Sequence, residues 1–380
     1  MEFRFHQHIQ EIPAQQWNAL LCEFNPLISH EFLAAMEQHG CVSETFGWMP
    51  LHAALYEDDQ LVAAMPLYLK SNNYGEFVFD HAWSSAYQQA GIGYYPKLVS
   101  AVPYTPAFGE RLLCKGELSE SLVSTFLQQI QSFSDKNGIS GFHCLFPNSA
   151  ELDCYQQQHL MIRHDCQYHW HNQAYESFDD FLAQLVSRKR KNIKKERTSV
   201  EQQGITFRWL DGHTAKEKDW VDVTRFYNNT FEEKWGMATF NLGFFQQIGK
   251  TLPENILLVL ADDTDGQCIA GALMYISESH LYGRHWGCDE QVDNLHFETC
   301  YYQGIEYCIK HGLKVFEPGA QGEHKVARGF VPTLTRSAHW MRPGPFDQAL
   351  QNFCEQERQA VFEYIDQLNN KLPYRQQESS

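Results

Sequence analysis

The chain has 380 residues, more than the roughly 250–300 at which a single hydrophobic core stops growing, so two lobes are expected. Hydrophobic residues make up 43% and aromatic residues 14% of the chain, which excludes a largely disordered protein. The net charge of −17 excludes a general nucleic-acid coat, because such a protein needs a basic surface.

A β-hairpin is predicted in the first half of the chain. Two apolar runs of strand length, Leu51–Tyr56 and Leu61–Tyr68, flank a turn at Glu57–Gln60. The elements predicted after it are a helix over Leu118–Lys136, a glycine stop at Gly138 and a strand over Ile139–Phe146.

An insertion rich in aromatic residues and glycine lies near residues 70–111. It makes the stretch from hairpin turn to glycine stop longer in the first half (58 to 138) than in the second (265 to 312). Such a segment is either functional or a surface excursion that packs on its own aromatic rings. Lys97 and Tyr104 are its candidate substrate or phosphate contacts.

A capping box at Ser177–Asp180 predicts a helix that continues through Ile193 and opens the second lobe. This helix carries seven basic residues in ten positions: Arg188, Lys189, Arg190, Lys191, Lys194, Lys195 and Arg197. A positive cluster on an acidic chain predicts an anion site, with Arg188, Arg190 and Lys191 as phosphate contacts. The alternative is an ordinary solvated helix face.

The second half repeats the order of the first. A hairpin is predicted over Ile256–Ala261 and Cys268–Tyr275. It is followed by a helix over Leu295–Lys310, a glycine stop at Gly312 and a strand over Leu313–Phe316. Four matched elements in the same order favour a duplicated unit. The predicted domains are residues 1–172, residues 173–345, and a C-terminal amphipathic helix with a polar tail over residues 346–380.

Hairpin, helix and strand in this order form the core of the GNAT acyltransferase fold, and the tandem arrangement resembles the FemAB-like group, specifically its predicted N-acyltransferases. The segments that carry the resemblance are Tyr94–Lys97, Val102–Pro106, Gln167–Trp170, Arg188–Arg197, Tyr282–Gly287 and Phe316–Lys325. The resemblance implies a mixed α/β fold of two tandem GNAT-like lobes packed around a cleft. It also implies transfer of an acyl or aminoacyl group from acyl-CoA or aminoacyl-tRNA. The implied acceptor is a small-molecule or cell-wall-precursor amine, and tRNA is a possible partner as donor.

The donor site departs from the usual GNAT pattern, in which an R/Q-x-x-G-x-G/A loop at a helix N-terminus holds the coenzyme A pyrophosphate. The second lobe has the acidic segment Gly287–Glu290 at that place. The first lobe contains the matching letters at Gln88–Gly93, but Tyr94–Pro96 is a poor helix start. Two alternatives therefore stay open: an acyl-CoA-dependent N-acetyltransferase of a small amine, and a non-catalytic module that binds tRNA or phosphate.

Acyl transfer to an amine needs a proton acceptor, a group that stabilises the oxyanion, and a proton for the leaving group. The densest candidate cluster is at the end of the last predicted strand. Glu317 or His324 is expected to accept the amine proton, and Lys325 and Arg328 to hold a phosphate or carboxylate, with Gln321 as a further contact. The alternative is that Glu317 pairs with Arg328 or Lys325 and only orders the turn.

Arg284 and His285 lie on the strand after the second hairpin. Successive residues of a strand face opposite sides, so only one of the two faces any given site. Arg284 is a candidate substrate contact. His285 is a candidate catalytic residue, and its alternative is a structural histidine.

The remaining histidines and cysteines favour no metal and no disulfide. None of the eleven cysteines forms a C-x-x-C pair, so buried reduced thiols are expected. His164, Cys166, His169 and His171 lack paired metal-ligand spacing. Because there is neither a signal peptide nor an apolar run of membrane-spanning length, a cytoplasmic protein without an integral membrane segment is expected.

Overall fold

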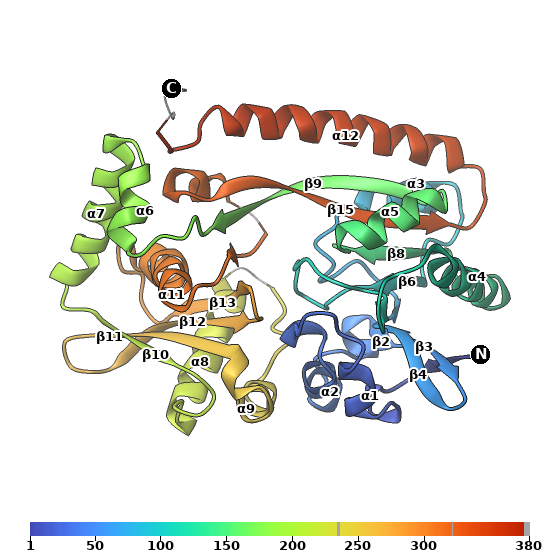
Figure 1. Cartoon of the computed structure of the whole chain (residues 1–380), viewed down its shortest axis with the longest axis horizontal. Coiled ribbons are helices and arrows are strands. Elements are labelled where there is room, and N and C mark those ends of the chain that lie inside the picture. Colours follow the sequence, from blue (N-terminus) through green and yellow to red (C-terminus); the bar gives the residue numbers. More distant parts are fainter. Residues whose placement is uncertain (234–235, 321, 376–380) are drawn as a thin grey trace. The chain divides into compact units, whose positions relative to one another are not determined.

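The structure is a computed structural model that describes residues 1–233, 236–320 and 322–375. The chain divides into two compact units, each built from two separate stretches. The first unit comprises residues 1–166 and 334–364, and the second comprises residues 167–333 and the chain from 365 onward. Figure 1 shows the elements of both units coloured along the sequence.

The unit boundaries differ from the sequence-based division, which assigns residues 334–345 to the second lobe. Residues 334–341 group with the first unit because β15 (Val331–Met341) pairs antiparallel with β8 (Gly141–Leu145). Pairing between such distant segments leaves no local signal in the sequence.

The first unit contains two sheets. The neighbours in its four-stranded sheet are all antiparallel, in the order β1 (Glu2–His6), β3 (His52–Glu57), β4 (Gln60–Met65) and β7 (Leu113–Cys114). From β15 and β8 the other sheet continues to β6 (Lys97–Ser100), β5 (Tyr68–Lys70) and β2 (Trp48–Pro50). The β8–β6 pair is parallel, so this sheet is mixed, in agreement with the predicted fold class.

The predicted hairpin, helix and strand of the first half are confirmed as β3–β4, α4 (Glu120–Asn137) and β8. The Ser119 side chain caps the start of α4, and Gly138 ends it with a left-handed φ of 69°. Further elements of this unit are η1 (Ile9–Glu11), α1 (Ala14–Asn18), η2 (Pro26–Ile28), α2 (His30–Gln38), η3 (Glu44–Phe46), α5 (Ser149–Gln157) and most of α12 (Asp347–Asn369). The last of these confirms the predicted C-terminal helix.

The aromatic insertion has elements of its own. It contains α3 (His81–Gln89) and β6. The rings of Trp83, Tyr87 and Tyr94 are buried in a small core that also includes Leu350 of α12. The insertion is therefore a packed part of the first unit and not a loose excursion.

The second unit holds one mixed sheet. Its strands follow the order β10 (Thr206–Leu210), β11 (Ile256–Asp262), β12 (Cys268–Ile276), β13 (His280–Cys288), β14 (Val315–Glu317) and β9 (Met161–His171), the last of which begins in the first unit. β13 and β14 are parallel, and the other neighbours are antiparallel. The predicted second hairpin is confirmed as β11–β12. Further elements of the unit are α8 (Glu217–Glu233), α9 (Leu242–Thr251), η4 (Pro253–Asn255) and η6 (Glu323–Arg328).

The predicted helix over Leu295–Lys310 forms with an irregular start. α10 (Leu295–Phe297) leads into the π-helical turn η5 (Glu298–Tyr302), which continues as α11 (Gln303–His311). Gly312 ends it with a left-handed φ of 71°, as expected. Single π-turns are frequent at functional sites.

The basic segment forms two helices and not the single predicted one. Ser177 caps α6 (Phe178–Gln184) as expected, and α7 (Ser187–Gln202) follows after a break. Val186 is extended at the break, and its N–H donates to the Pro373 carbonyl oxygen at 2.8 Å. A distant partner for this backbone group thus ends α6 early.

Two global features accompany this fold. All eleven cysteines are free thiols. No helix within the described ranges combines the length and apolarity needed to cross a bilayer.

Candidate functional site

Three buried ionisable side chains lie around the end of β14 in the second unit. Glu317, the last residue of β14, is 1% exposed. Arg284 of the neighbouring β13 places Nη2 3.5 Å from Glu317 Oε2 and donates from Nη1 to the Glu317 carbonyl oxygen at 3.3 Å. After the strand, Lys325 Nζ donates to the Gly319 carbonyl oxygen at 2.7 Å. These three predicted site residues are thus gathered in the interior of one unit.

A β-bulge presents Arg284 to this cluster. The β12–β13 register pairs Gly283 and His285 with consecutive residues of β12, which leaves Arg284 without a ladder partner. Bulges commonly re-aim a side chain next to an active site. Burial lowers the pKa of Arg284, while the Glu317 carboxylate opposes that shift. The two form a desolvated ion pair in which each partner depends on the other.

Lys325 is the most unusual of the three groups. It lies in η6 and is 2% exposed. Burial, together with the nearby charge of Arg284, lowers the pKa of its ammonium to about 7. Within the described residues no carboxylate forms an ion pair with it. A lysine with this pKa is partly neutral near pH 7 and can both accept and donate a proton.

His324 lies next to Lys325 and is exposed to solvent. Its Nε2 is 2.9 Å from the Tyr301 hydroxyl, which is held by the π-turn η5. Partial desolvation of the ring and the charges of Arg328 and Lys325 lower the pKa of His324, so its ring is neutral near pH 7. The ring nitrogen that does not face Tyr301 remains available to an incoming polar group.

Arg328 is held by another element. Its Nη2 donates to Glu196 Oε1 of α7 at 2.9 Å, and its guanidinium lies 3.4 Å from the ring centroid of Phe297. The Tyr302 hydroxyl also donates to Glu196. This arrangement does not favour the predicted phosphate contact. Gln321, the other predicted contact of this turn, lies outside the described residues.

His285 follows Arg284 on β13 and has a different environment. Its ring lies among four aromatic rings, with centroid distances of 4.9 Å to Phe240, 5.2 Å to Tyr227, 5.6 Å to Phe245 and 6.2 Å to Tyr275. Burial lowers the pKa of His285 to about 3. This apolar setting favours the structural role for His285.

Replacing His285 with phenylalanine should leave transfer within about twofold of the wild type, because its buried Nε2 has no hydrogen-bond partner among the described residues. The unfolded state binds a proton on His285 near pH 6.5, whereas the native state does so only near pH 3. Wild-type stability therefore falls as the pH falls from 6.5 to 3. The variant should lack this loss. Thermal melts between pH 3 and 7, beside a rate measurement, check both outcomes, and a large loss of rate would restore His285 as a catalytic candidate.

His169 of β9 joins the cluster, although the sequence places it only among loosely spaced metal-ligand types. It is 4% exposed, and its Nε2 lies 3.3 Å from Gln167 Oε1. Burial, aided by positive neighbours that include Arg284 and Lys325, lowers the pKa of His169 to about 3. His169 is therefore a neutral, buried polar residue next to this cluster.

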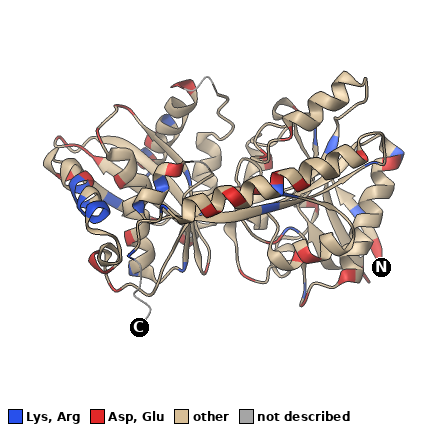
Figure 2. Cartoon of the chain, turned by 90° about the horizontal axis from the view of Figure 1, so that it is seen from above, with Lys and Arg blue, Asp and Glu red and all other residues tan. Residues whose placement is uncertain are grey.

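The basic helix α7 pairs only part of its charge within the described part of the chain. Lys194 pairs with Asp179, and Arg197 pairs with Glu298 and Glu306. Arg190 is half-buried. The residues we call the α7 basic face are exposed and share one side of the helix at i, i+3 and i+7: Arg188, Lys191 and Lys195. Figure 2 shows the gathering of basic residues on this helix.

The two predicted contacts in the first unit have other partners. Lys97 is 0% exposed, and its ammonium pairs with Glu76 at 2.8 Å and also with Asp80. The Tyr104 hydroxyl donates to the Cys41 carbonyl oxygen at 2.9 Å. Such saturation of Lys97 by two carboxylates does not favour a phosphate contact.

Neither Gln88–Gly93 nor Gly287–Glu290 has the form of a pyrophosphate cradle. Gln88 and Gln89 belong to the C-terminal end of α3, and the element that follows Gly93 is the strand β6. At Gly287, a Cβ would lie 1.8 Å from the Phe226 carbonyl oxygen, so this glycine lets α8 approach β13. Gly287 therefore serves packing, and the segment Gln88–Gly93 does not lead into a helix.

A groove of about 830 Å³ also lies on the second unit. It is lined by His171, Tyr175, Asp180 and Gln184 among others, and by none of Glu317, Arg284 and Lys325. The chemistry-bearing cluster and this groove are thus different features of the unit.

Comparisons with known proteins identify relatives of the whole chain. Residues 8–376 match the FemAB-like family, described as peptidoglycan biosynthesis/recognition. The fold is similar to that of FemX (TM-score 0.54, 10% identity, 92% of this chain and all of that one). It is also similar to L-PGS from Bacillus licheniformis (TM-score 0.51, 11% identity, 86% of this chain and 96% of that one). A third similar structure is the C-terminal domain of a putative lysylphosphatidylglycerol synthetase from Agrobacterium fabrum (TM-score 0.53, 8% identity, 90% of this chain and 95% of that one). No curated protein gives a significant sequence match.

Proposed function

The chain belongs to the FemAB-like family of acyl- and aminoacyltransferases, and on that premise we propose that Lys325 carries the proton during transfer to an amine. The observation that supports this role is a buried lysine without a carboxylate partner among the described residues. Its pKa is lowered to about 7, and it lies beside a buried Arg284–Glu317 pair. A proton-transfer group works best when its pKa lies near the working pH.

The reaction needs one such group used twice. The neutral amine attacks the acyl carbonyl carbon, and the new C–N bond forms as the carbonyl becomes an oxyanion. Neutral Lys325 accepts the proton that the amine nitrogen loses. The bond from the acyl carbon to the leaving oxygen or sulfur then breaks, and Lys325 returns the proton to that atom. The same residue thus begins and ends each turnover neutral.

The other residues of the cluster position this step. Arg284 adds fixed positive charge near Lys325, which helps to keep the lysine pKa low. Glu317 compensates the charge of Arg284 inside the unit. The exposed His324 offers a neutral ring nitrogen to the incoming substrate. Glu317 and His324 therefore keep roles at the site, while the proton acceptor is Lys325.

We further propose aminoacyl-tRNA as the donor and a cell-wall-precursor amine as the acceptor. Neither Gln88–Gly93 nor Gly287–Glu290 has the form of a coenzyme A cradle, because the first leads into the strand β6 and Gly287 lets α8 approach β13. The α7 basic face, in contrast, presents three exposed cations to solvent on a chain whose net charge is −17. Phosphate backbones bind such faces by releasing counterions.

Replacing Arg188, Lys191 and Lys195 with glutamine should weaken tRNA binding by about tenfold or more. It should also reduce the slope of log K against log salt by about one for each lost phosphate contact. The matched control removes three exposed cations elsewhere: Lys115, Lys136 and Lys218. Fluorescence anisotropy at several salt concentrations makes the measurement. Equal binding by both triple variants would contradict a tRNA role for this face.

The transfer reaction itself is tested by product mass. The purified chain is incubated with alanyl-tRNA or with acetyl-CoA, and with a panel of primary amines that includes a cell-wall precursor peptide. We expect mass spectrometry to find an alanyl adduct on a precursor amine with the wild type. This adduct should be absent with the Lys325 variants. If only acetyl adducts were found, the donor would be acyl-CoA and not aminoacyl-tRNA. The absence of an adduct on any amine would overturn the proposed reaction.

A further inference from the structure

The first unit contains a cavity of about 230 Å³. All of its lining residues belong to that unit. It is smaller than the roughly 300–1,000 Å³ of pockets for drug-sized ligands, so its occupant is small. Val78, Phe146 and Val361 form an apolar wall, and Arg163, Asp165 and Ser337 contribute polar groups.

Arg163 presents a fixed and incompletely satisfied guanidinium. Its Nε and Nη2 donate to the Glu357 carboxylate at 3.1 and 2.6 Å, and it stacks 5.2 Å from the ring centroid of Trp83. Arg163 is 6% exposed, and its Nη1 is buried without a hydrogen-bond partner among the described residues. A buried N–H of this kind costs free energy unless a ligand accepts from it. A carboxylate is the group that matches a guanidinium best.

Asp165 supplies the opposite charge two residues further along β9. Positions i and i+2 of a strand share a face, so Arg163 and Asp165 project to the same side. Asp165 Oδ1 accepts from the N–H of Cys166 at 2.7 Å, which leaves the second oxygen for a cation.

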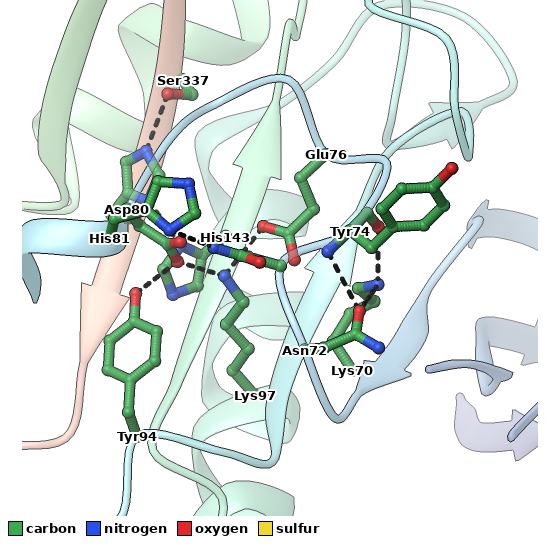
Figure 3. A network of polar contacts seen from close by, with 12 residues as sticks. Lys70, Asn72, Tyr74, Glu76, Asp80, His81, Tyr94, Lys97, His143 and Ser337 are labelled. Carbon is green, nitrogen blue, oxygen red and sulfur yellow. Dashed lines mark hydrogen bonds and ion pairs between the residues drawn. The ribbon is translucent and has the colours of Figure 1, made fainter. Parts of the chain in front are cut away.

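A chain of hydrogen bonds anchors Ser337 at the cavity. Its Oγ lies 2.7 Å from His339 Nε2, and His339 Nδ1 lies 2.7 Å from His143 Nδ1. Burial lowers the pKa of both histidines well below the usual value, so both rings are neutral. Figure 3 labels the two ends of this chain, Ser337 and His143, together with the buried Lys97 ammonium and its two carboxylates. The hydroxyl makes one bond to His339 and keeps capacity for another.

We propose that this cavity binds the α-amino carboxylate group of a small amino acid. Arg163 Nη1 donates to the carboxylate, Asp165 accepts from the ammonium, Ser337 adds a hydrogen bond, and the apolar wall receives the side chain. The lining carries two arginines, Arg163 and Arg336, and two carboxylates, Asp165 and Glu357. This balance suits a zwitterion better than a simple anion or cation.

The same chemical group has two sources, free amino acids and the side-chain end of a diaminopimelate residue in a peptide. Isothermal titration calorimetry on the full chain therefore uses L-alanine, L-leucine and a diaminopimelate-containing tripeptide. The control ligands are propionate, which lacks the ammonium group, and propylamine, which lacks the carboxylate. We expect at least one zwitterion to bind, and to bind about tenfold or more tightly than propionate or propylamine. No acyl donor is added, so the result is independent of the transfer reaction.

Two variants separate binding from folding. Asp165→Asn removes the ammonium partner from an exposed position, and its matched control is Asp153→Asn on α5. Affinity should fall about tenfold in the first and stay unchanged in the second. The double variant Arg163→Met with Glu357→Gln removes the buried guanidinium together with its half-buried carboxylate partner. It should also lose binding while it still melts cooperatively. Absence of binding to every zwitterion at about 10 mM, or equal loss in both aspartate variants, would overturn the proposal.

Discussion

Replacing Lys325 with methionine should reduce transfer by a factor of about 10² to 10⁴ and at the same time raise the melting temperature of the chain. The loss of rate follows from removing the group that moves the proton. The gain in stability has a separate cause. Folding lowers the pKa of Lys325 from 10.5 to about 7, so the native state carries an unfavourable buried charge that methionine lacks.

The pH dependence of this gain has a defined sign. Between pH 10.5 and 7 the unfolded state binds the Lys325 proton and the native state does not, so wild-type stability falls as the pH falls. Below pH 7 the cost is constant at roughly 3–5 kcal/mol, because a tenfold change in proton affinity corresponds to about 1.4 kcal/mol. The advantage of the methionine variant should therefore be largest at or below pH 7 and should shrink towards pH 10.

The matched control is Lys70 of the first unit. Burial lowers its pKa to about 7 as well, and its Nζ donates to Asn72 Oδ1 and to the Tyr74 carbonyl oxygen. Lys70→Met removes an equally buried amine but no group of the proposed site, so transfer should persist. If both variants lose activity together, the effect of Lys325 is structural.

Replacing Glu317 alone with leucine should destabilise the chain by about 3–5 kcal/mol, because the guanidinium of Arg284 stays buried without its partner. Arg284→Leu should cost a similar amount for the reciprocal reason. The double variant should recover most of this loss, since apolar side chains often replace a buried ion pair without cost. Urea or thermal unfolding of the four proteins forms a double-mutant cycle.

The double variant should recover stability in this cycle but not the transfer rate. The double variant removes the charge of Arg284, which helps to keep the pKa of Lys325 low. Transfer should therefore remain low at pH 7, with its pH optimum displaced upwards. A double variant with full activity at pH 7 would show that the pair only holds the fold. A stable Glu317→Leu variant would show that the pair is not desolvated.

Local patterns were enough to predict the repeated elements. The hairpins, both glycine stops and the C-terminal helix depend on apolar spacing, turn residues and left-handed positions, which are all encoded within short windows. The same windows placed Glu317 and Lys325 near one strand end, whereas Arg284 was predicted only on the strand after the second hairpin. The family match over residues 8–376 confirms the resemblance that these segments carry.

Long-range contacts were beyond such reasoning. Arg328 finds its partner Glu196 132 positions away, and Val186 bonds to Pro373, which splits the basic helix. The saturation of Lys97 by Glu76 and Asp80 and the π-turn that holds Tyr301 leave no periodic signal. The pKa of Lys325 depends on burial, which no spacing rule reports for a lysine.

The most direct test of the account is the pH profile of the transfer rate in the wild type and in Lys325→Arg. Arginine keeps the positive charge but cannot titrate near neutrality. The wild-type rate should rise with pH through an apparent pKa near 7, because Lys325 must be neutral to accept the amine proton. The arginine variant should be slow and lack that rise. A variant that keeps the wild-type rate and the same acid limb would contradict the claim that Lys325 carries the proton.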